Sequence, residues 1–113
     1  MSDNFKIFKY ELTGEKSQEL EMPRNAQVLE VEFQPQTNGG VELCMWALVL
    51  SDHPKEKRRV VMIDTGEPIP DEVVERFRHI KTIQMMAPRV EDDGEVVPKA
   101  IVFHLFLERG VVN

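Results

Sequence analysis

Residues 27–50 read QVLEVEFQPQTNGGVELCMWALVL, and this stretch decides the fold. Its first part, Gln27–Phe33, alternates apolar and polar side chains, which is the period of a strand with one buried face. Its last part, Val41–Leu50, is apolar at nearly every position and fits a strand in the middle of a sheet. Between them, Pro35–Gly40 supplies residues that tolerate positive φ and so reverse the chain. The stretch therefore predicts an antiparallel hairpin, and the residues expected on its core side are Leu29, Val31 and Phe33.

Further strand patterns lie on both sides of this hairpin. Phe5–Leu12 alternates with a change of phase at Ile7–Phe8, which indicates either a bulge or a strand with both faces partly covered. Pro23 has no N–H for a ladder, so it ends a short strand or places it at a sheet edge. The other predicted elements are strands over Gln18–Met22, Arg58–Ile63, His79–Met86 and Lys99–Glu108, and a polar hairpin loop over Ala87–Pro98 that turns at Asp93–Gly94.

A short helical pattern covers residues 71–77. Asp71 can cap its first turn, and the apolar side is formed by Val73, Val74 and Phe77. Such a helix is too short to be stable alone, so it must pack on a sheet. The whole pattern predicts a mainly β chain, a single-domain antiparallel β-sandwich or small barrel of about seven strands with this one short helix. We expect the innermost strands to be Val41–Leu50 and Lys99–Glu108.

The composition is that of one globular domain over residues 1–113, with short flexible ends near 1–4 and 109–113. The hydrophobic fraction of 42% and the charged fraction of 30% are ordinary for a folded chain. A net charge of −6 argues against nucleic acid as a partner. The basic run Lys55–Arg59 is instead expected to be a solvated strand edge. The longest apolar run is interrupted by Glu42 and too short for a membrane span, and no secretory signal begins the chain, so we expect a soluble cytoplasmic protein.

The sequence contains no recognisable catalytic constellation. It lacks a Gly-rich phosphate loop, a paired Cys motif, a His-Glu-x-x-His motif and a Gly-x-Ser-x-Gly elbow. The single cysteine, Cys44, lies in an apolar run without a nearby histidine, which indicates a buried thiol. The spacing of His53, His79 and His104 does not require a metal. We therefore expect no enzyme activity, no cofactor and no metal, and we single out His104 because it lies in an otherwise apolar strand.

The loop Asp64–Pro70 is the strongest candidate for a binding site. Two prolines and one glycine make it rigid and irregular. Two arginines precede it, and Trp46 offers a ring for stacking, although core packing is the default interpretation of a lone tryptophan in a central strand. The candidate binding residues are Trp46, Arg58, Arg59, Asp64, Thr65, Gly66, Glu67, Pro68 and His104.

Five segments taken together resemble one sequence family. It is a family of short, uncharacterised proteins encoded by tailed bacteriophages and prophages, with the motif order Met-Pro, Trp-Ala-Leu-Val, Thr-Gly-x-Pro-Ile-Pro and Phe-His-x-Phe. The resemblance covers residues 6–108. The segments that carry it are Leu20–Leu29 (LEMPRNAQVL), Met45–Val49 (MWALV), Asp64–Pro70 (DTGEPIP), His79–Met85 (HIKTIQM) and Val102–Phe106 (VFHLF).

The chain departs from this family pattern in three places. Asp64 stands where a glycine is expected, and there is extra sequence at Val73–Arg78 and a longer loop at Arg89–Pro98. The resemblance implies a phage accessory protein that acts in the cytoplasm of a bacterial host. It brings no activity with it.

Three functions stay open on this basis. The leading hypothesis is a non-enzymatic module that binds a host protein, for example to inhibit a defence system; small size, acidic charge and the missing catalytic motifs favour it. A second is a binder of a small molecule, such as a nucleotide signal, at the Asp64–Pro70 loop. A third is a minor virion or assembly protein that forms homo-oligomers through exposed sheet edges.

Overall fold

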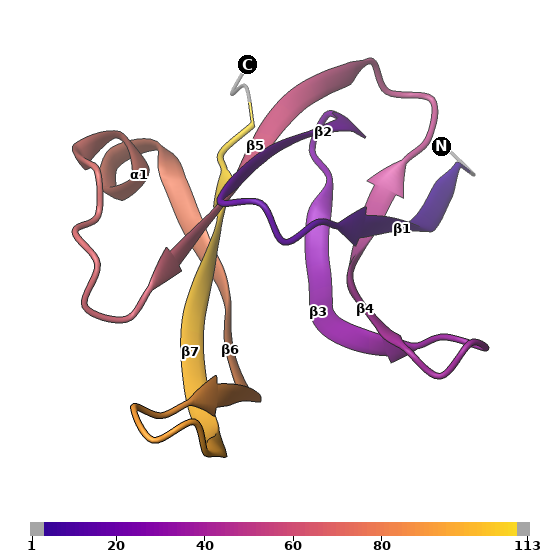
Figure 1. The fold of residues 1–113 in the computed structure, drawn as a ribbon. Helices are drawn as coiled ribbons and strands as arrows, with labels where there is room; N and C mark the ends of the chain where they lie inside the picture. Colours follow the sequence, from indigo (N-terminus) through magenta and orange to yellow (C-terminus); the bar gives the residue numbers. More distant parts are fainter. Residues whose placement is uncertain (1–3, 111–113) are drawn as a thin grey trace.

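The computed structural model describes residues 4–110, which form seven strands and one short helix (Figure 1). All strand pairs are antiparallel. The predicted mainly β fold with a helix after the fifth strand is therefore confirmed. In chain order the elements are β1 (Phe5–Leu12), β2 (Ser17–Pro23), β3 (Gln27–Pro35), β4 (Val41–Leu50), β5 (Lys55–Asp64), α1 (Asp71–Arg76), β6 (Phe77–Val90) and β7 (Val96–Glu108).

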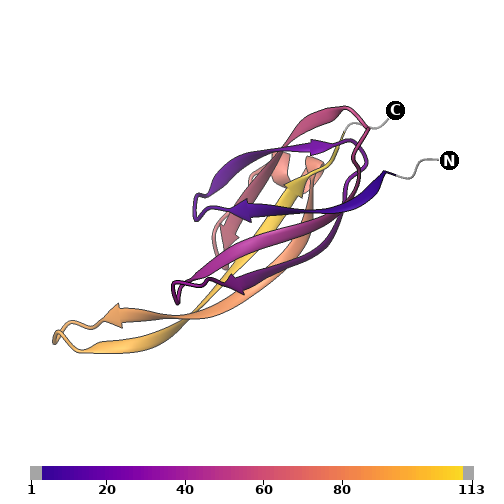
Figure 2. The same ribbon diagram turned by 90° about the vertical axis from the view of Figure 1, so that its right-hand side faces the viewer.

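The strands form two sheets, which we call sheet A and sheet B. Sheet A has the order β1-β4-β3, and sheet B has the order β2-β5-β7-β6. β4 and β7 therefore each have a strand on both sides, which confirms that they are inner strands. The sheets pack face to face without closing into a barrel, so the structure is sandwich-like (Figure 2). The molecule is long and thin, measuring 63 × 39 × 16 Å.

The core lies between the two sheets and is filled by alternate residues of each strand. This follows from the period of two, because successive side chains point to opposite faces of a sheet. The two central strands supply most of the core. Their core residues are Leu43, Met45, Ala47 and Val49 of β4 and Phe103, Leu105 and Leu107 of β7.

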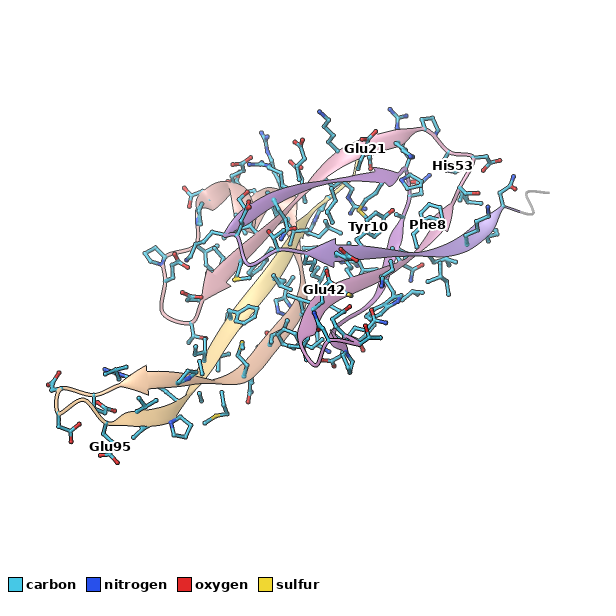
Figure 3. All side chains as sticks on the ribbon, turned by 45° about the vertical axis from the view of Figure 1, so that its right-hand side comes forward. Phe8, Tyr10, Glu21, Glu42, His53 and Glu95 are labelled. Atoms are coloured by element: carbon cyan, nitrogen blue, oxygen red, sulfur yellow. The ribbon has the colours of Figure 1, made fainter. Side chains whose placement is uncertain are left out.

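β1 carries apolar side chains on both of its faces. It pairs with β4 residue by residue from Phe5 to Leu12 with no change of register, so the bulge interpretation of its sequence was wrong. Phe8 and Tyr10 pack against the core (labelled in Figure 3), whereas Ile7 points to the outer face of sheet A. The change of phase in the sequence therefore marks a strand with two apolar faces.

A bulge does occur in β3. The register with β4 shifts between Val28 and Glu30, which leaves Leu29 as the extra residue. Because the extra residue inverts the alternation, Val28 packs against the core and Leu29 is exposed, contrary to the prediction for Leu29. Val31 lies in the core and Phe33 packs against it, as predicted.

α1 and the loop before it cover part of the outer face of sheet B. Pro70 occupies the N-cap position and no side chain caps the helix, so the predicted cap by Asp71 was wrong. Val73 and Phe77 are buried as predicted, but Val74 faces solvent. Six residues make fewer than two turns, so the apolar side of the helix is too narrow to include both valines.

β6 and β7 continue well beyond the rest of sheet B. The pairing of β5 with β7 ends at Asp64 and Phe103, and past this point the hairpin has no strand beside it (Figure 2). We call this projecting part, residues 84–102, the arm; Glu95 lies at its tip (Figure 3).

The arm corrects the prediction of a loop over Ala87–Pro98. The strands run to Val90 and resume at Val96, so only residues 91–95 form the loop. Pro88 and Pro98 stand opposite each other in the ladder. They are tolerated because alternate N–H groups in a two-stranded ribbon point outward, where the arm has no neighbouring strand to bond.

Candidate functional site

The Asp64–Pro70 loop lies against the outer face of sheet B beside His104. Thr65 ties it there, since its N–H donates to Val102 O at 3.2 Å and its Oγ1 lies 2.8 Å from His104 Nε2. A pocket of about 240 Å³ opens between loop and sheet. It is lined by Asp64, Thr65, Gly66, Glu67 and His104 of the predicted set and by Ile63, Ile69 and Phe106, but not by Pro68.

A chain of hydrogen bonds crosses the outer face of sheet B next to this pocket. Distances of 2.8 Å separate His79 Nε2 from Thr82 Oγ1, Thr82 Oγ1 from His104 Nδ1, and His104 Nε2 from Thr65 Oγ1. Thr65 Oγ1 also donates to Val102 O at 3.3 Å. We call this arrangement the histidine–threonine chain.

The direction of each bond in the chain can be deduced from its end. A carbonyl oxygen only accepts, so Thr65 uses its single hydroxyl hydrogen on Val102 O and must accept from His104 Nε2–H. His104 Nδ1 then accepts from Thr82, and Thr82 in turn accepts from His79 Nε2–H. Every donor has one acceptor in this scheme. Both ring nitrogens of His104 are thus occupied by hydroxyl groups.

Sequence reasoning missed His79 and Thr82 as neighbours of the loop. Residues three apart in a regular strand point to opposite faces. The register between β6 and β7 shifts between His79 and Lys81, and this irregularity brings His79 and Thr82 to the same face. No signal in the sequence marks it.

One lysine pairs with both carboxylates of the loop. Lys16 on the turn before β2 contacts the carboxylate of Glu67 at 2.5 Å and that of Asp64 at 3.8 Å. The hydrogen bond from Lys16 holds the pKa of Glu67 below its ordinary value. The lining of the pocket therefore includes two carboxylates, Asp64 and Glu67, and neither a lysine nor an arginine.

The two predicted arginines hold the fold together elsewhere. Arg58 donates from Nε to Glu108 O at 2.8 Å and from Nη1 to Ala26 O at 3.3 Å, and burial lowers its pKa. Arg59 pairs with Glu72 and Glu108 and lies 5.2 Å from the ring centre of Phe77. Neither arginine reaches the Asp64–Pro70 pocket.

Trp46 lies on the outer face of sheet A, so its default assignment to the core was wrong. Odd-numbered residues of β4 point into the core, and Trp46, an even-numbered residue, points away from it. Its neighbours across the ladders are Lys9 on β1 and Glu30 on β3. The structure therefore separates Trp46 from the Asp64–Pro70 loop, which lies on the outer face of the other sheet.

Trp46 belongs to a continuous apolar patch on β1 and β4. Phe5 stands opposite Leu50 and Ile7 opposite Leu48 in the ladder, and both β1 residues are 60% exposed. Residues directly opposite each other in an antiparallel pair have side chains on the same face and in contact range. Polar residues border the patch, namely Lys9, Gln27 and Glu30. We call the apolar patch the Trp46 face; it consists of Phe5, Ile7, Trp46, Leu48 and Leu50.

Cys44 lies on the same side of β4 but is fully buried, which confirms the buried thiol. Its Sγ lies 3.6 Å from Gln34 Oε1 and 3.7 Å from Glu42 O. Burial raises the pKa of Cys44, which disfavours the reactive thiolate.

One protein family matches this chain. The protein family described as "Domain of unknown function (DUF7352)" matches residues 4–111. Comparison with curated proteins gives no match, and comparison with solved structures gives none either. Within residues 4–110, no helix is long and apolar enough to cross a membrane, and no group of three or more His, Cys, Asp or Glu side chains is placed to hold a metal ion.

Proposed function

Because the chain belongs to the DUF7352 family, whose description assigns no activity, we propose from its geometry that it is a non-enzymatic module that binds a partner protein. The Trp46 face is the observation that carries this proposal. It presents five apolar side chains side by side on the outer surface of sheet A, two of them more than half exposed. Contiguous apolar patches of this kind on soluble proteins mark interaction sites.

The composition of the Trp46 face matches that of a protein interface. Such interfaces have an apolar centre with a polar rim, and Trp is enriched among the residues that contribute most to affinity. Trp46 lies within the patch, and Lys9 and Glu30 flank it in the ladders. A rigid β-sheet also carries these side chains at fixed spacing, so little ordering is needed on binding.

The state of the chemically active groups supports a role without catalysis. His104 has both ring nitrogens bound to threonine hydroxyls, so neither is free to take a proton from a substrate. Cys44 is buried with a raised pKa. These two residues are the ones that sequence analysis would first examine as base or nucleophile.

The proposed biological setting is a bacteriophage protein that acts in the cytoplasm of its bacterial host. The motif resemblance over residues 6–108 supports it. The proposed partner is a host protein, with a component of a defence system as the first candidate.

Site-specific photocrosslinking tests the proposal. A photoreactive residue replaces Ile7 on the Trp46 face or, as the matched control, Val74 on α1, which is an exposed valine on the opposite side of the molecule. We expect one discrete adduct in bacterial lysate from position 7, none from position 74, and loss of the adduct when Trp46→Ser is added to a folded variant. Equal adducts from both positions, or none from position 7 in lysates of several hosts, would overturn the proposal.

The pocket at the Asp64–Pro70 loop supports a second candidate, the binding of a small molecule. Its volume of about 240 Å³ and its mixed lining of Ile63, Phe106 and Thr65 suit a compact ligand. Asp64 and Glu67 make it a poor match for a phosphate-bearing nucleotide. A thermal-shift panel of uncharged metabolites and nucleotides checks this, because a ligand at about 100 times its Kd stabilises the fold by about 2.7 kcal/mol. A panel without any shift would rule out this candidate.

A further inference from the structure

A hollow of about 400 Å³ lies between the edge strands of the two sheets. On this side of the sandwich β3 is the last strand of sheet A and β6 is the last strand of sheet B. Both strands have their bulge at the hollow, because residues 28–30 of β3 and residues 79–80 of β6 belong to its lining. Bulges are over-represented at sheet edges and next to active sites. We call this hollow the seam pocket.

Two arginines line the seam pocket, Arg58 and Arg78. Arg78 on β6 stands opposite Leu107, a core residue of β7, and therefore lies on the inner face of sheet B. Arg58 on β5 lies on the same face, because Val60, two residues later, is in the core. Their side chains project from the strands on either side of β7. Two cations are thus placed on the face that also holds the core.

Neither arginine is paired with a carboxylate that lines the pocket. Arg58 is half-buried and donates to two neutral carbonyl groups, from Nε to Glu108 O at 2.8 Å and from Nη1 to Ala26 O at 3.3 Å. The guanidinium group of Arg78 has no hydrogen bond or ion pair with any residue in the range 4–110. Burial lowers the pKa of Arg58, the carboxylates of Glu56 and Glu108 oppose this, and the charge of Arg78 lowers the pKa further. Both carboxylates lie outside the pocket lining.

The one carboxylate in the lining, that of Glu30, already has a cation. Its Oε1 accepts hydrogen bonds from Lys81 Nζ at 2.9 Å and from the Val31 N–H at 2.8 Å. Lys81 itself is not a lining residue, so it neutralises Glu30 from beside the pocket. Within the lining, the charges of the two arginines are therefore left for a ligand.

We propose that the seam pocket binds a small molecule with a phosphate monoester group, which Arg58 and Arg78 hold between them. A guanidinium group matches the oxygens of a phosphate in bidentate fashion. A phosphate monoester carries a charge of about −1.5 to −2 at pH 7, which suits two cations better than a single carboxylate does. Val28, Ile80 and Leu107 supply apolar side chains to the same wall, so the rest of the ligand is compact and partly apolar.

The seam pocket differs from the pocket at the Asp64–Pro70 loop in both place and charge. The loop pocket lies on the outer face of sheet B and has two carboxylates and no arginine in its lining. The inference does not rest on the proposed function, because its test uses small probes and no partner protein.

Calorimetric titration with phenyl phosphate tests the proposal, with benzoate and phenol as probes of lower charge. We expect one site for phenyl phosphate, binding of benzoate that is weaker by about tenfold or more, and no binding of phenol. Arg78→Gln should weaken the binding of phenyl phosphate by about tenfold or more, because charged hydrogen bonds are lost. Arg89→Gln is the matched control and should bind as the unmodified chain does, since Arg89 is an exposed arginine of the arm without a partner among residues 4–110. Arg58→Lys keeps the charge and loses the bidentate contact, so it should also weaken binding, and thermal unfolding checks that it is folded.

The position of the bound probe is measured by ¹H–¹⁵N NMR spectra. Amide shifts that change at residues 27–30 and 78–80 support the seam pocket, whereas changes confined to Asp64–Pro70 would overturn the inference. No binding of phenyl phosphate up to about 10 mM would overturn it as well. So would equal losses in Arg78→Gln and Arg89→Gln, or binding of benzoate as tight as that of phenyl phosphate. Crosslinking from position 7 to a host protein is scored separately, so either proposal can fail without the other.

Discussion

The hydroxyl oxygen of Thr82 lies 2.8 Å from His104 Nδ1 and 2.8 Å from His79 Nε2, so one threonine on β6 joins the two histidines of sheet B. The rings of the two histidines are 6.1 Å apart, and His79 also meets Phe106 edge-on at 5.5 Å. With Thr65 at the far end, this arrangement fixes the loop to the sheet. The loop that forms one wall of the pocket is therefore tied to the sheet by hydrogen bonds.

The first prediction concerns the direction of these bonds. We expect His104 to carry a proton on Nε2 and to accept at Nδ1, because Thr65 donates its hydroxyl hydrogen to the carbonyl of Val102 at the end of the chain. Long-range ¹H–¹⁵N NMR spectra distinguish the two tautomers directly. Thr82→Val should lower the free energy of unfolding by about 1 kcal/mol and mix the tautomers, because the donor to Nδ1 is lost. Thr37→Val, in the exposed turn after β3, is the control. It should change neither the free energy of unfolding nor the tautomer of His104. A proton found on Nδ1 would contradict the assignment.

The second prediction concerns Tyr10, whose buried Oη has no hydrogen-bond partner among residues 4–110. Burial raises its pKa above the ordinary value of 10.0. Tyr10→Phe keeps the ring and removes the unsatisfied group, so we expect it to leave stability unchanged or raise it by about 1 kcal/mol in urea unfolding. The raised pKa means that the folded chain holds this proton more tightly than the unfolded one. The difference in unfolding free energy between Tyr10→Phe and the unmodified chain should therefore grow in favour of Tyr10→Phe as the pH rises past 10.0.

A clear loss of stability in Tyr10→Phe at neutral pH would show that the hydroxyl is hydrogen-bonded in solution. Phe8→Leu provides a measure of ring packing at a neighbouring site of the same strand, since Phe8 also packs against the core. Phe8→Leu should lower the free energy of unfolding at every pH.

Strand positions could be predicted from the sequence because their alternation is local. The hairpin of residues 27–50 and the central places of β4 and β7 follow from side-chain type alone. The length of the arm could not be predicted in this way. Pro88 and Pro98 are signals of a loop in an ordinary sheet, and they are compatible with a strand only because the arm has no neighbours there.

The candidate site shows the same limit. The contact between Thr65 and His104 joins residues that the sequence analysis had already singled out. The Trp46 face was hidden because a tryptophan in an apolar strand is normally a core residue, and only the phase of β4 shows that it points outward. Its one sequence signal was the change of phase at Ile7–Phe8, which places apolar side chains on both faces of β1.

The third prediction concerns the seam between β3 and β6, where Lys81 Nζ lies 2.9 Å from Glu30 Oε1. The hydrogen bond from Lys81 and then that from the Val31 N–H hold the pKa of Glu30 below its ordinary value of 4.5. A lowered carboxyl pKa stabilises the folded state above pH 4.5, and this contribution is lost as the pH falls through the lowered value.

Glu30→Gln should therefore show a smaller loss of unfolding free energy between pH 7 and acid than the unmodified chain, as measured by chemical unfolding at each pH. Glu91→Gln, in the loop at the tip of the arm, is the control. Its unfolding free energy should change with pH as that of the unmodified chain does. If the unfolding free energy of Glu30→Gln changed with pH as that of the unmodified chain does, the contact between Glu30 and Lys81 would not form in solution. High salt should reduce the difference, because the pair is partly exposed to solvent.

The last prediction concerns Glu42, which lies beside Glu11 on the outer face of sheet A. Burial, followed by the hydrogen bond and the charge of Glu11, raises the pKa of Glu42, while Lys9 opposes the rise. A raised carboxyl pKa means that ionised Glu42 destabilises the folded chain above pH 4.5, so Glu42→Gln should stabilise it at pH 7 and lose this advantage in acid. Thermal unfolding of the two proteins at pH 7 and in acid measures both effects. A lower unfolding temperature for Glu42→Gln at pH 7 would contradict the prediction, because it would mean that the ionised carboxylate stabilises the fold.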